Sequence, residues 1–179
     1  MAQQYFVLGI GGTGMRCIES LIHLCAMGMF DDTDIHLLAL DTDKDNGNFA
    51  RLKEVKEAYV KAKGTDASLR TALNETFFSA NINYYEFSPN YEVKSDFMSV
   101  FNYGDTKFNN PEQTAIADLV LTKNVETFNL RHGYRAQTHL GSMMMYHSIL
   151  EAARSNKNSE LKTYLQKLIQ VAHNGGARG

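Results

Sequence analysis

The sequence contains little of what marks several large classes of protein. Its 179 residues include two cysteines, two prolines and no tryptophan. Cys17 and Cys25 fall within one expected helix, and a helix rises about 1.5 Å per residue, so the two thiols cannot come within disulfide distance. We expect both cysteines to be buried packing residues in a reducing compartment.

An excess of charge of one sign is also missing. The chain has 18 Lys and Arg against 20 Asp and Glu, a net charge of −2. Without a basic excess to bind a polyanion, we expect no nucleic-acid partner. No apolar run approaches the about 20 residues of a membrane span, and the start "MAQQYF" lacks the basic region of a secretory signal. The sequence therefore predicts a cytoplasmic protein with no membrane partner.

What the sequence does have is a glycine-rich loop between an expected strand and an expected helix. Residues 5–10 form a nearly continuous apolar run, which is typical of a buried parallel strand. Beyond the glycines of "GIGGTG", apolar residues recur from Met15 at helical spacing, and a second apolar run over 35–40 stops at Asp41. This order indicates a βαβ unit, and hence an α/β fold with a Rossmann-like parallel sheet and flanking helices.

The chemistry of the loop suits a phosphate group. Gly11 and Gly12 have no Cβ to hold an anion away from the backbone N–H groups. Gly14 lets the helix begin close against the strand, and the positive amino end of that helix attracts the anion. Thr13 adds a hydroxyl that can donate to a phosphate oxygen. The alternative is a glycine turn that only packs the helix on the sheet.

Acidic residues follow the second expected strand, in "DTDKDN". Asp41 and Asp43 would lie at the edge of the sheet where such folds bind ligands. In a dinucleotide-binding domain Asp41 would bind the ribose hydroxyls, although its distance from Gly14 exceeds the usual ~20 residues. Asp43 is a candidate to orient water around a metal ion on the phosphates. The alternative is that both acids cap the following turn.

The rest of the chain gives weaker signals. Residues 44–130 show no clean alternation of strand and helix, so we expect a large, mainly helical insertion within one domain spanning 1–179. Inside it, 81–93 looks extended, 66–78 looks helical with Asp66 or Ser68 as cap, and 109–130 looks helical. Amphipathic helices are expected within 143–155 and 159–174. A doubly wound sheet would continue with a strand at "GGARG", so we expect the amino-terminal part of a longer protein.

Two segments resemble a known family. The pair "VLGIGGTGMRCIESL" and "HLLALDTD" is similar to the opening of the tubulin–FtsZ superfamily, in which a phosphate loop leads into a long helix and the second strand ends in Asn/Asp-Thr-Asp. The bacterial tubulin-like proteins are the closer match. The segment "GYRAQTHLGSMMMYHSILEAA" resembles the superfamily's γ-phosphate loop, with small residues at Gly133, Ala136 and Gly141 and with Arg135 in place of a family glycine.

The resemblance implies a domain that binds GTP or GDP, with Mg²⁺ held through the phosphates, and a parent protein that self-associates through its nucleotide face. GTPase activity would belong to the full-length assembled form, because the family's signature loop and its acidic catalytic loop are not found in this sequence. The candidate nucleotide-binding residues are Gly11, Gly12, Thr13, Gly14, Arg16, Asp41, Asp43, Gly133, Tyr134, Arg135, Ala136 and Gly141.

Other functions remain open on the sequence alone. A Rossmann-type NAD(P) domain would explain the glycines and Asp41. A ThiF-like adenylating domain pairs similar glycines with an Asp-x-Asp sequence, but its usual zinc cysteines are absent here. A scaffold module that kept the fold and binds no ligand is the third alternative.

Overall fold

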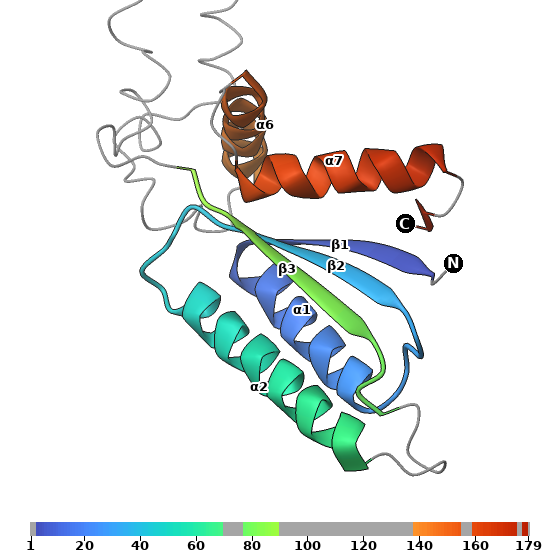
Figure 1. Cartoon of the computed structure of the whole chain (residues 1–179). Helices are drawn as coiled ribbons and strands as arrows, with labels where there is room; N and C mark the ends of the chain where they lie inside the picture. The colour runs from blue at the N-terminus through green and yellow to red at the C-terminus, as the bar shows by residue number, and fades with distance from the viewer. Residues whose placement is uncertain (1–2, 70–76, 90–137, 155–158, 175–176, 179) are drawn as a thin grey trace, which may run out of the picture.

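The computed structural model describes residues 3–69, 77–89, 138–154, 159–174 and 177–178 (Figure 1). Within them lies a parallel sheet with helices on both of its faces, in the strand order β3-β2-β1-β4. The α/β fold and the parallel sheet expected from the sequence are therefore confirmed. The helix expected over 109–130 lies outside the described residues.

The predicted βαβ unit is present. Strand β1 (Gln4–Ile10) leads directly into α1 (Gly11–Ala26), and β2 (Asp34–Leu40) follows. The two strands pair in parallel along their whole length, from Gln4 opposite Asp34 to Ile10 opposite Leu40. The side chains of β2 from Ile35 to Leu40 are all buried, which explains why that strand appears in the sequence as an unbroken apolar run.

A second βαβ unit lies where the sequence indicated an insertion. Helix α2 (Asn48–Leu69) packs beside α1, and β3 (Asn81–Phe87) pairs in parallel with β2. The range 44–130 is therefore wrong in its first part, because residues 48–69 and 81–87 belong to the sheet and its helical layer. The helix expected to begin at Asp66 or Ser68 is also corrected, since both residues lie inside α2.

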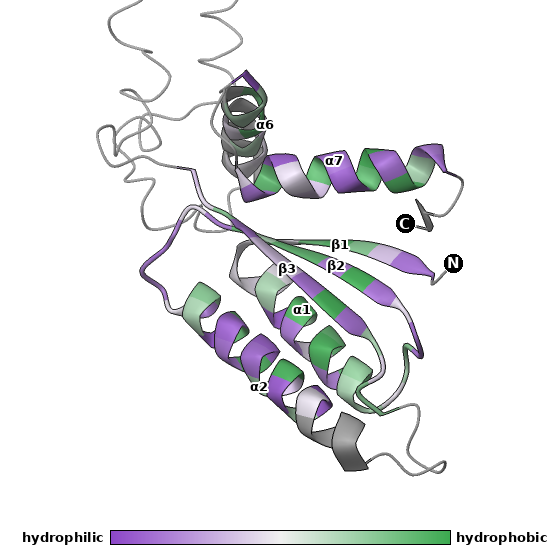
Figure 2. Cartoon of the chain, in the orientation of Figure 1, coloured by the Kyte–Doolittle hydropathy of each residue, from purple (hydrophilic) through white to green (hydrophobic). Residues whose placement is uncertain are grey.

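The sequence of helix α2 has no clear apolar stripe because the helix is largely hydrophilic, as Figure 2 shows. Its contact with the core depends on Phe49, Leu52 and Tyr59, which are buried. The Tyr59 hydroxyl also donates to the carbonyl of Ala80, over 2.8 Å, and so fastens α2 to the start of β3.

Two further helices cover the other face of the sheet, and a last short strand extends it. Helices α6 (Thr138–Arg154) and α7 (Glu160–His173) lie on the side opposite α1 and α2 (Figure 1). Strand β4 (Ala177–Arg178) then pairs in parallel with the first residues of β1. No helix in the described ranges is both long enough and apolar enough to cross a membrane.

The two cysteines of α1 differ in environment. Cys25 is buried, and burial raises the pKa of its thiol to about 11. Cys17 is exposed, so the expectation that both are core residues is wrong for this one. Eight residues exceed two turns of 3.6 residues, and the two side chains therefore point in different directions.

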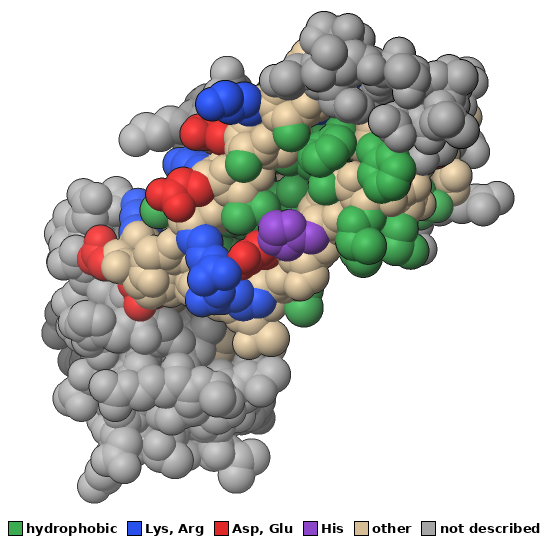
Figure 3. Space-filling model, turned by 90° about the horizontal axis from the view of Figure 1, so that it is seen from below, with side chains coloured by type: hydrophobic (Ala, Val, Ile, Leu, Met, Phe, Trp, Pro, Cys, Tyr) green, Lys and Arg blue, Asp and Glu red, His purple; other side chains and the backbone are tan. Residues whose placement is uncertain are grey.

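Exposed hydrophobic side chains lie at the carboxyl end of α1 and just beyond it, at Leu24, Met27 and Met29. Figure 3 views the molecule from below and shows hydrophobic side chains gathered on one part of that face and charged side chains on another. The end of α1 is remote from its glycine-rich start, so these side chains take no part in the site described below.

An aromatic cluster holds α7 on the sheet, and a histidine lies within it. The ring of His36 stacks on Phe6 at 4.5 Å between centroids, and Tyr164 of α7 meets Phe6 edge-on at 5.6 Å. The His36 Nε2 atom lies 3.3 Å from Gln4 Oε1, whereas Nδ1 is buried without a partner among the described residues. Burial, with a smaller effect from Lys167, lowers the pKa of His36, and Asp34 opposes this.

The lowered pKa predicts a pH dependence of stability. The unfolded chain binds a proton at His36 near its ordinary pKa of about 6.5, more readily than the folded chain does. The stabilisation contributed by the neutral form of His36 should therefore be complete above that pH. The free energy of unfolding should fall as the pH drops toward the pKa of His36 in the folded state. Urea unfolding of the wild type and of His36→Phe, about one pH unit either side of 6.5, measures this. If the free energy of unfolding decreased by the same amount at the lower pH in both proteins, the prediction would be contradicted.

Candidate phosphate-binding site

The glycine loop lies at the point where the order of the strands reverses. Helices α1 and α2 cover one face of the sheet, and α7 crosses the other face before β4 returns to the free side of β1. The chain therefore winds in opposite directions on the two sides of β1. In open parallel α/β sheets, ligands bind outside the carboxyl ends of the strands at such a reversal. Gly11 follows the carboxyl end of β1 directly.

Two of the glycines bring α1 into backbone contact with β1. A Cβ placed on Gly14 would lie 2.7 Å from the backbone carbon of Gly9, and a Cβ on Gly9 would lie 2.5 Å from Cδ1 of Ile18. Real Cβ atoms do not approach other atoms so closely. The packing role expected of Gly14 is therefore present in the structure, and Gly9 shares it.

The amino end of α1 has no side chain to cap it. Gly11 has a φ of +68°, a conformation that glycine adopts at no steric cost, and open space lies where its Cβ would be. The N-cap residue is Ile10, which has no hydrogen-bonding side chain, and the first turn contains no acidic residue. Neither the N-cap side chain nor an acid of the first turn therefore offsets the partial positive charge at this end of the helix, where Thr13 is exposed.

The start of α2 forms the second side of the site. The side-chain nitrogen of Asn48 lies 2.9 Å from the position that a Cβ on Gly12 would take. A side chain at Gly12 would displace the Asn48 amide from this position and would hold an anion away from the backbone. The sequence analysis missed Asn48, because no spacing rule connects the first residue of one helix with the first turn of another.

Between β2 and α2 the chain is held by its own side chains. Asp41 Oδ1 accepts from the N–H of Asp43 over 3.1 Å, Asp43 Oδ1 from that of Asp45 over 3.0 Å, and Asn46 Oδ1 from that of Asn48 over 2.9 Å. Each bond spans two residues, the pattern by which Asp and Asn favour turns. Both acids thus have the turn-capping contacts that the sequence left open as an alternative to ligand binding.

Asp41 is deeply buried in this turn, with 3% of its surface exposed. Its second oxygen, Oδ2, accepts from the side-chain amide of Asn46 over 3.3 Å. Burial raises the pKa of Asp41, while the hydrogen bonds from the Asp43 backbone and the Asn46 side chain oppose that shift. The contacts of this carboxylate are consistent with a residue that shapes the loop.

Thr42 presents a buried hydroxyl in this loop. It is 5% exposed, and no described residue hydrogen-bonds its Oγ1. Leu40 pairs with Ile10, so Thr42 follows β2 at the level where the glycine loop follows β1. A buried hydroxyl without a partner costs about 1–3 kcal/mol, and a ligand oxygen would supply that partner.

Arg16 belongs to an ion-pair network one turn past the loop. Its guanidinium lies 3.6 Å from Glu19, and Glu19 also accepts two hydrogen bonds from Arg51 of α2, over 2.7 and 3.1 Å. The Arg51 hydrogen bond is the main cause of the lowered pKa of Glu19. Glu19 thus connects α1 with α2 through Arg51, and Arg16 pairs with Glu19 from within α1.

The second expected phosphate loop is described only at its end. Gly133, Tyr134, Arg135 and Ala136 lie outside the described residues. Gly141 is buried in the first turn of α6, which begins at Thr138, so its expected place in a loop is corrected. No group of three or more His, Cys, Asp or Glu in the described ranges is arranged to hold a metal ion.

No model of a known protein family, no curated protein and no solved structure matches the chain. The resemblance to the tubulin–FtsZ superfamily therefore depends on the sequence motifs alone.

Two glycine-to-alanine substitutions should have opposite effects on stability, because Gly14 contacts the backbone of β1 and Gly64 has open space around it. Gly14→Ala would force a methyl group into the β1 backbone, and overpacking of this kind costs about 1–3 kcal/mol. Gly64→Ala, inside α2 with open space around it, should raise the free energy of unfolding by about 0.5–1 kcal/mol. Urea unfolding measures both. If Gly14→Ala were as stable as wild type, α1 would not touch β1 as described.

Proposed function

We propose that this domain binds a guanine nucleotide, GTP or GDP, with the phosphates at the amino end of α1 and Mg²⁺ held through them. The observation that carries the proposal is the place of the uncapped helix end at the carboxyl end of β1, where the strand order reverses. The loop amides of Gly11 and Gly12 would donate to phosphate oxygens. Thr42 Oγ1, buried and without a described partner, is a further candidate donor.

The choice of guanine, and of a parent protein that self-associates through the nucleotide face, depends on the resemblance to the tubulin-like proteins. The expectation of hydrolysis only in an assembled, full-length form has the same basis. Under this proposal the chain's own residues bind and orient the phosphates. The acids that would activate water come from another subunit.

A dinucleotide is the second candidate, because the strand order and the glycines also suit NAD(P). One feature disfavours it. The acid that would bind the ribose hydroxyls is Asp41, which is almost fully buried and has both carboxylate oxygens hydrogen-bonded within its own loop. Ribose binding would require breaking those bonds, so the mononucleotide is preferred.

Nucleotide binding is tested by thermal unfolding with GTP, ATP or NAD, each with Mg²⁺. A ligand at 100 times its Kd adds about 2.7 kcal/mol to the stability of the native state. We expect GTP to raise the unfolding midpoint most. A shift with NAD alone would contradict the proposal, and no shift with any of the three would favour a scaffold.

Thr13→Glu places a carboxylate at the amino end of α1. It should leave the protein folded, since an acid suits a helix start, and should abolish the GTP shift by repelling the phosphates. Thr163→Glu is the matched control, because Thr163 is also an exposed threonine in the first turn of a helix. A GTP shift that survives Thr13→Glu would place the nucleotide elsewhere.

Thr42→Val removes the unpartnered hydroxyl and keeps the shape of the side chain. We expect GTP affinity to fall about tenfold, near the 1–1.5 kcal/mol of one hydrogen bond, with unchanged or higher stability of the free protein. Thr33→Val is the control at the other end of β2. Its hydroxyl already donates to the Asp31 carbonyl over 2.8 Å, so that variant should lose stability and keep its affinity for GTP. Equal GTP affinity in Thr42→Val and wild type would exclude Thr42 from the site.

A further inference from the structure

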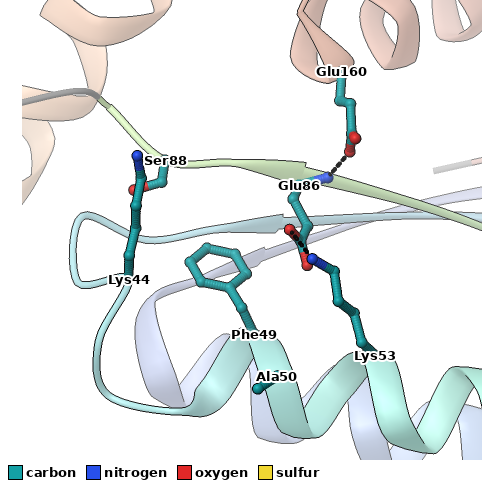
Figure 4. Close-up of a pocket in the computed structure, with 7 residues that line it drawn as sticks. All are labelled: Lys44, Phe49, Ala50, Lys53, Glu86, Ser88 and Glu160. Atoms are coloured by element: carbon teal, nitrogen blue, oxygen red, sulfur yellow. Dashed lines mark hydrogen bonds and ion pairs between the residues drawn. The ribbon is translucent and has the colours of Figure 1, made fainter.

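A pocket of 520 Å³ opens beside the candidate phosphate site, at the carboxyl end of β3 (Figure 4). Its walls come from the loop after β2, the first turns of α2, the end of β3 and the first turn of α7. The volume lies in the range usual for small-molecule sites. The lining residues are Lys44, Phe49, Ala50, Lys53, Glu86, Ser88 and Glu160.

Three of the charged groups in this pocket are already engaged. The ammonium group of Lys53 lies 2.9 Å from the Glu86 carboxylate. Glu160 accepts a hydrogen bond from the backbone N–H of Glu86, which also ties the start of α7 to β3. These contacts fix the walls of the pocket. The fourth charged group in its lining is the ammonium group of Lys44.

Lys44 and Ser88 supply donors that have no partner among the described residues. Ser88 Oγ is buried and has no hydrogen-bond partner in the described part of the chain. Figure 4 shows the Lys44 side chain reaching toward Ser88, and Lys44 forms no ion pair with any described residue. A ligand that presents acceptor atoms here would satisfy both groups.

The charge balance indicates what kind of ligand fits. Two lysines and two glutamates line the pocket, so their formal charges cancel, and the ring of Phe49 adds an apolar surface. A phosphate would gain little from walls with no net charge. An uncharged ring with acceptor atoms would find both an apolar surface and donors.

The pocket is next to the glycine loop along the chain and in space. Asn48 contacts Gly12, and the next two residues of α2, Phe49 and Ala50, already line the pocket. A molecule with phosphates at Gly11 and Gly12 therefore needs to pass only the first residue of α2 to reach it.

From these contacts we propose that the pocket binds the uncharged end, the base and sugar, of the nucleotide whose phosphates bind at the glycine loop. This inference rests on the proposed function. Lys44 and Ser88 donate to acceptor atoms of that end, and Phe49 supplies an apolar surface for the ring.

Calorimetric titration with inorganic tripolyphosphate and with GTP separates the two sites. Ala50→Trp fills the pocket from an exposed position, and Ala58→Trp is its control two turns further along α2, also exposed. We expect Ala50→Trp to weaken GTP binding at least tenfold and to leave tripolyphosphate binding unchanged, while Ala58→Trp changes neither. Lys44→Met, at an exposed loop position, should weaken GTP binding several-fold and should also leave tripolyphosphate binding unchanged.

The outcomes distinguish the two proposals. Wild-type affinity for GTP in both Ala50→Trp and Lys44→Met would overturn the pocket inference and leave the phosphate site standing. Equal weakening of GTP and tripolyphosphate would also overturn it, because the pocket would then act on the phosphates. Failure of wild-type protein to bind either compound would overturn the proposed function itself.

Discussion

The structure depends on one contact, in which the backbone of α1 touches the backbone of β1 at Gly14 and Gly9. Because neither residue has a Cβ, the helix can begin immediately after the strand ends. This close start fixes where the amino end of α1 points, at the carboxyl edge of the sheet. It also lets Ile18 pack on β1 and brings Ile22 and Cys25 into the core between the sheet and α2. Fold and candidate site are therefore set by the same two glycines.

The second side of the site is organised by hydrogen bonds within the loop that joins β2 to α2. Asp41, Asp43 and Asn46 each bond the backbone two residues further on, which brings Asn48 against Gly12. The contacts of Asp41 and Asp43 lie within this loop, so in the proposed function the attraction for an anion would come from the amino end of α1. The hydroxyls of Thr42 and Ser88, which have no partner within the described ranges, follow β2 and β3 in the direction in which we place the nucleotide.

The sequence predicts the parts of this fold whose apolar residues form an unbroken run or recur at helical spacing. Strands β1 and β2 and helix α1 follow from apolar runs and helical spacing. Helix α2 does not, since it is mostly hydrophilic with a glycine inside it. Strand β3 lies within the stretch 81–93 that looks extended, but its alternation with exposed Asn81 and Asn83 gives no apolar run that would assign it to the parallel sheet. The spacing of the glycines predicts a tight turn from strand to helix, and the packing of Gly14 on Gly9 agrees with it. The contact between Asn48 and Gly12, and the convergence of Lys44 with Ser88, depend on how two loops fold toward each other, which no local pattern encodes.

The central claim is that the backbone amides at the start of α1 bind phosphate oxygens. It is tested most directly by following the amide resonances of isotope-labelled protein by NMR during titration with Mg²⁺ and GTP. The account predicts that the signals of Gly11, Gly12 and Thr13 move first and furthest, with those of Thr42 and Asn48 following. Saturable GTP binding that leaves these amides unmoved would contradict it.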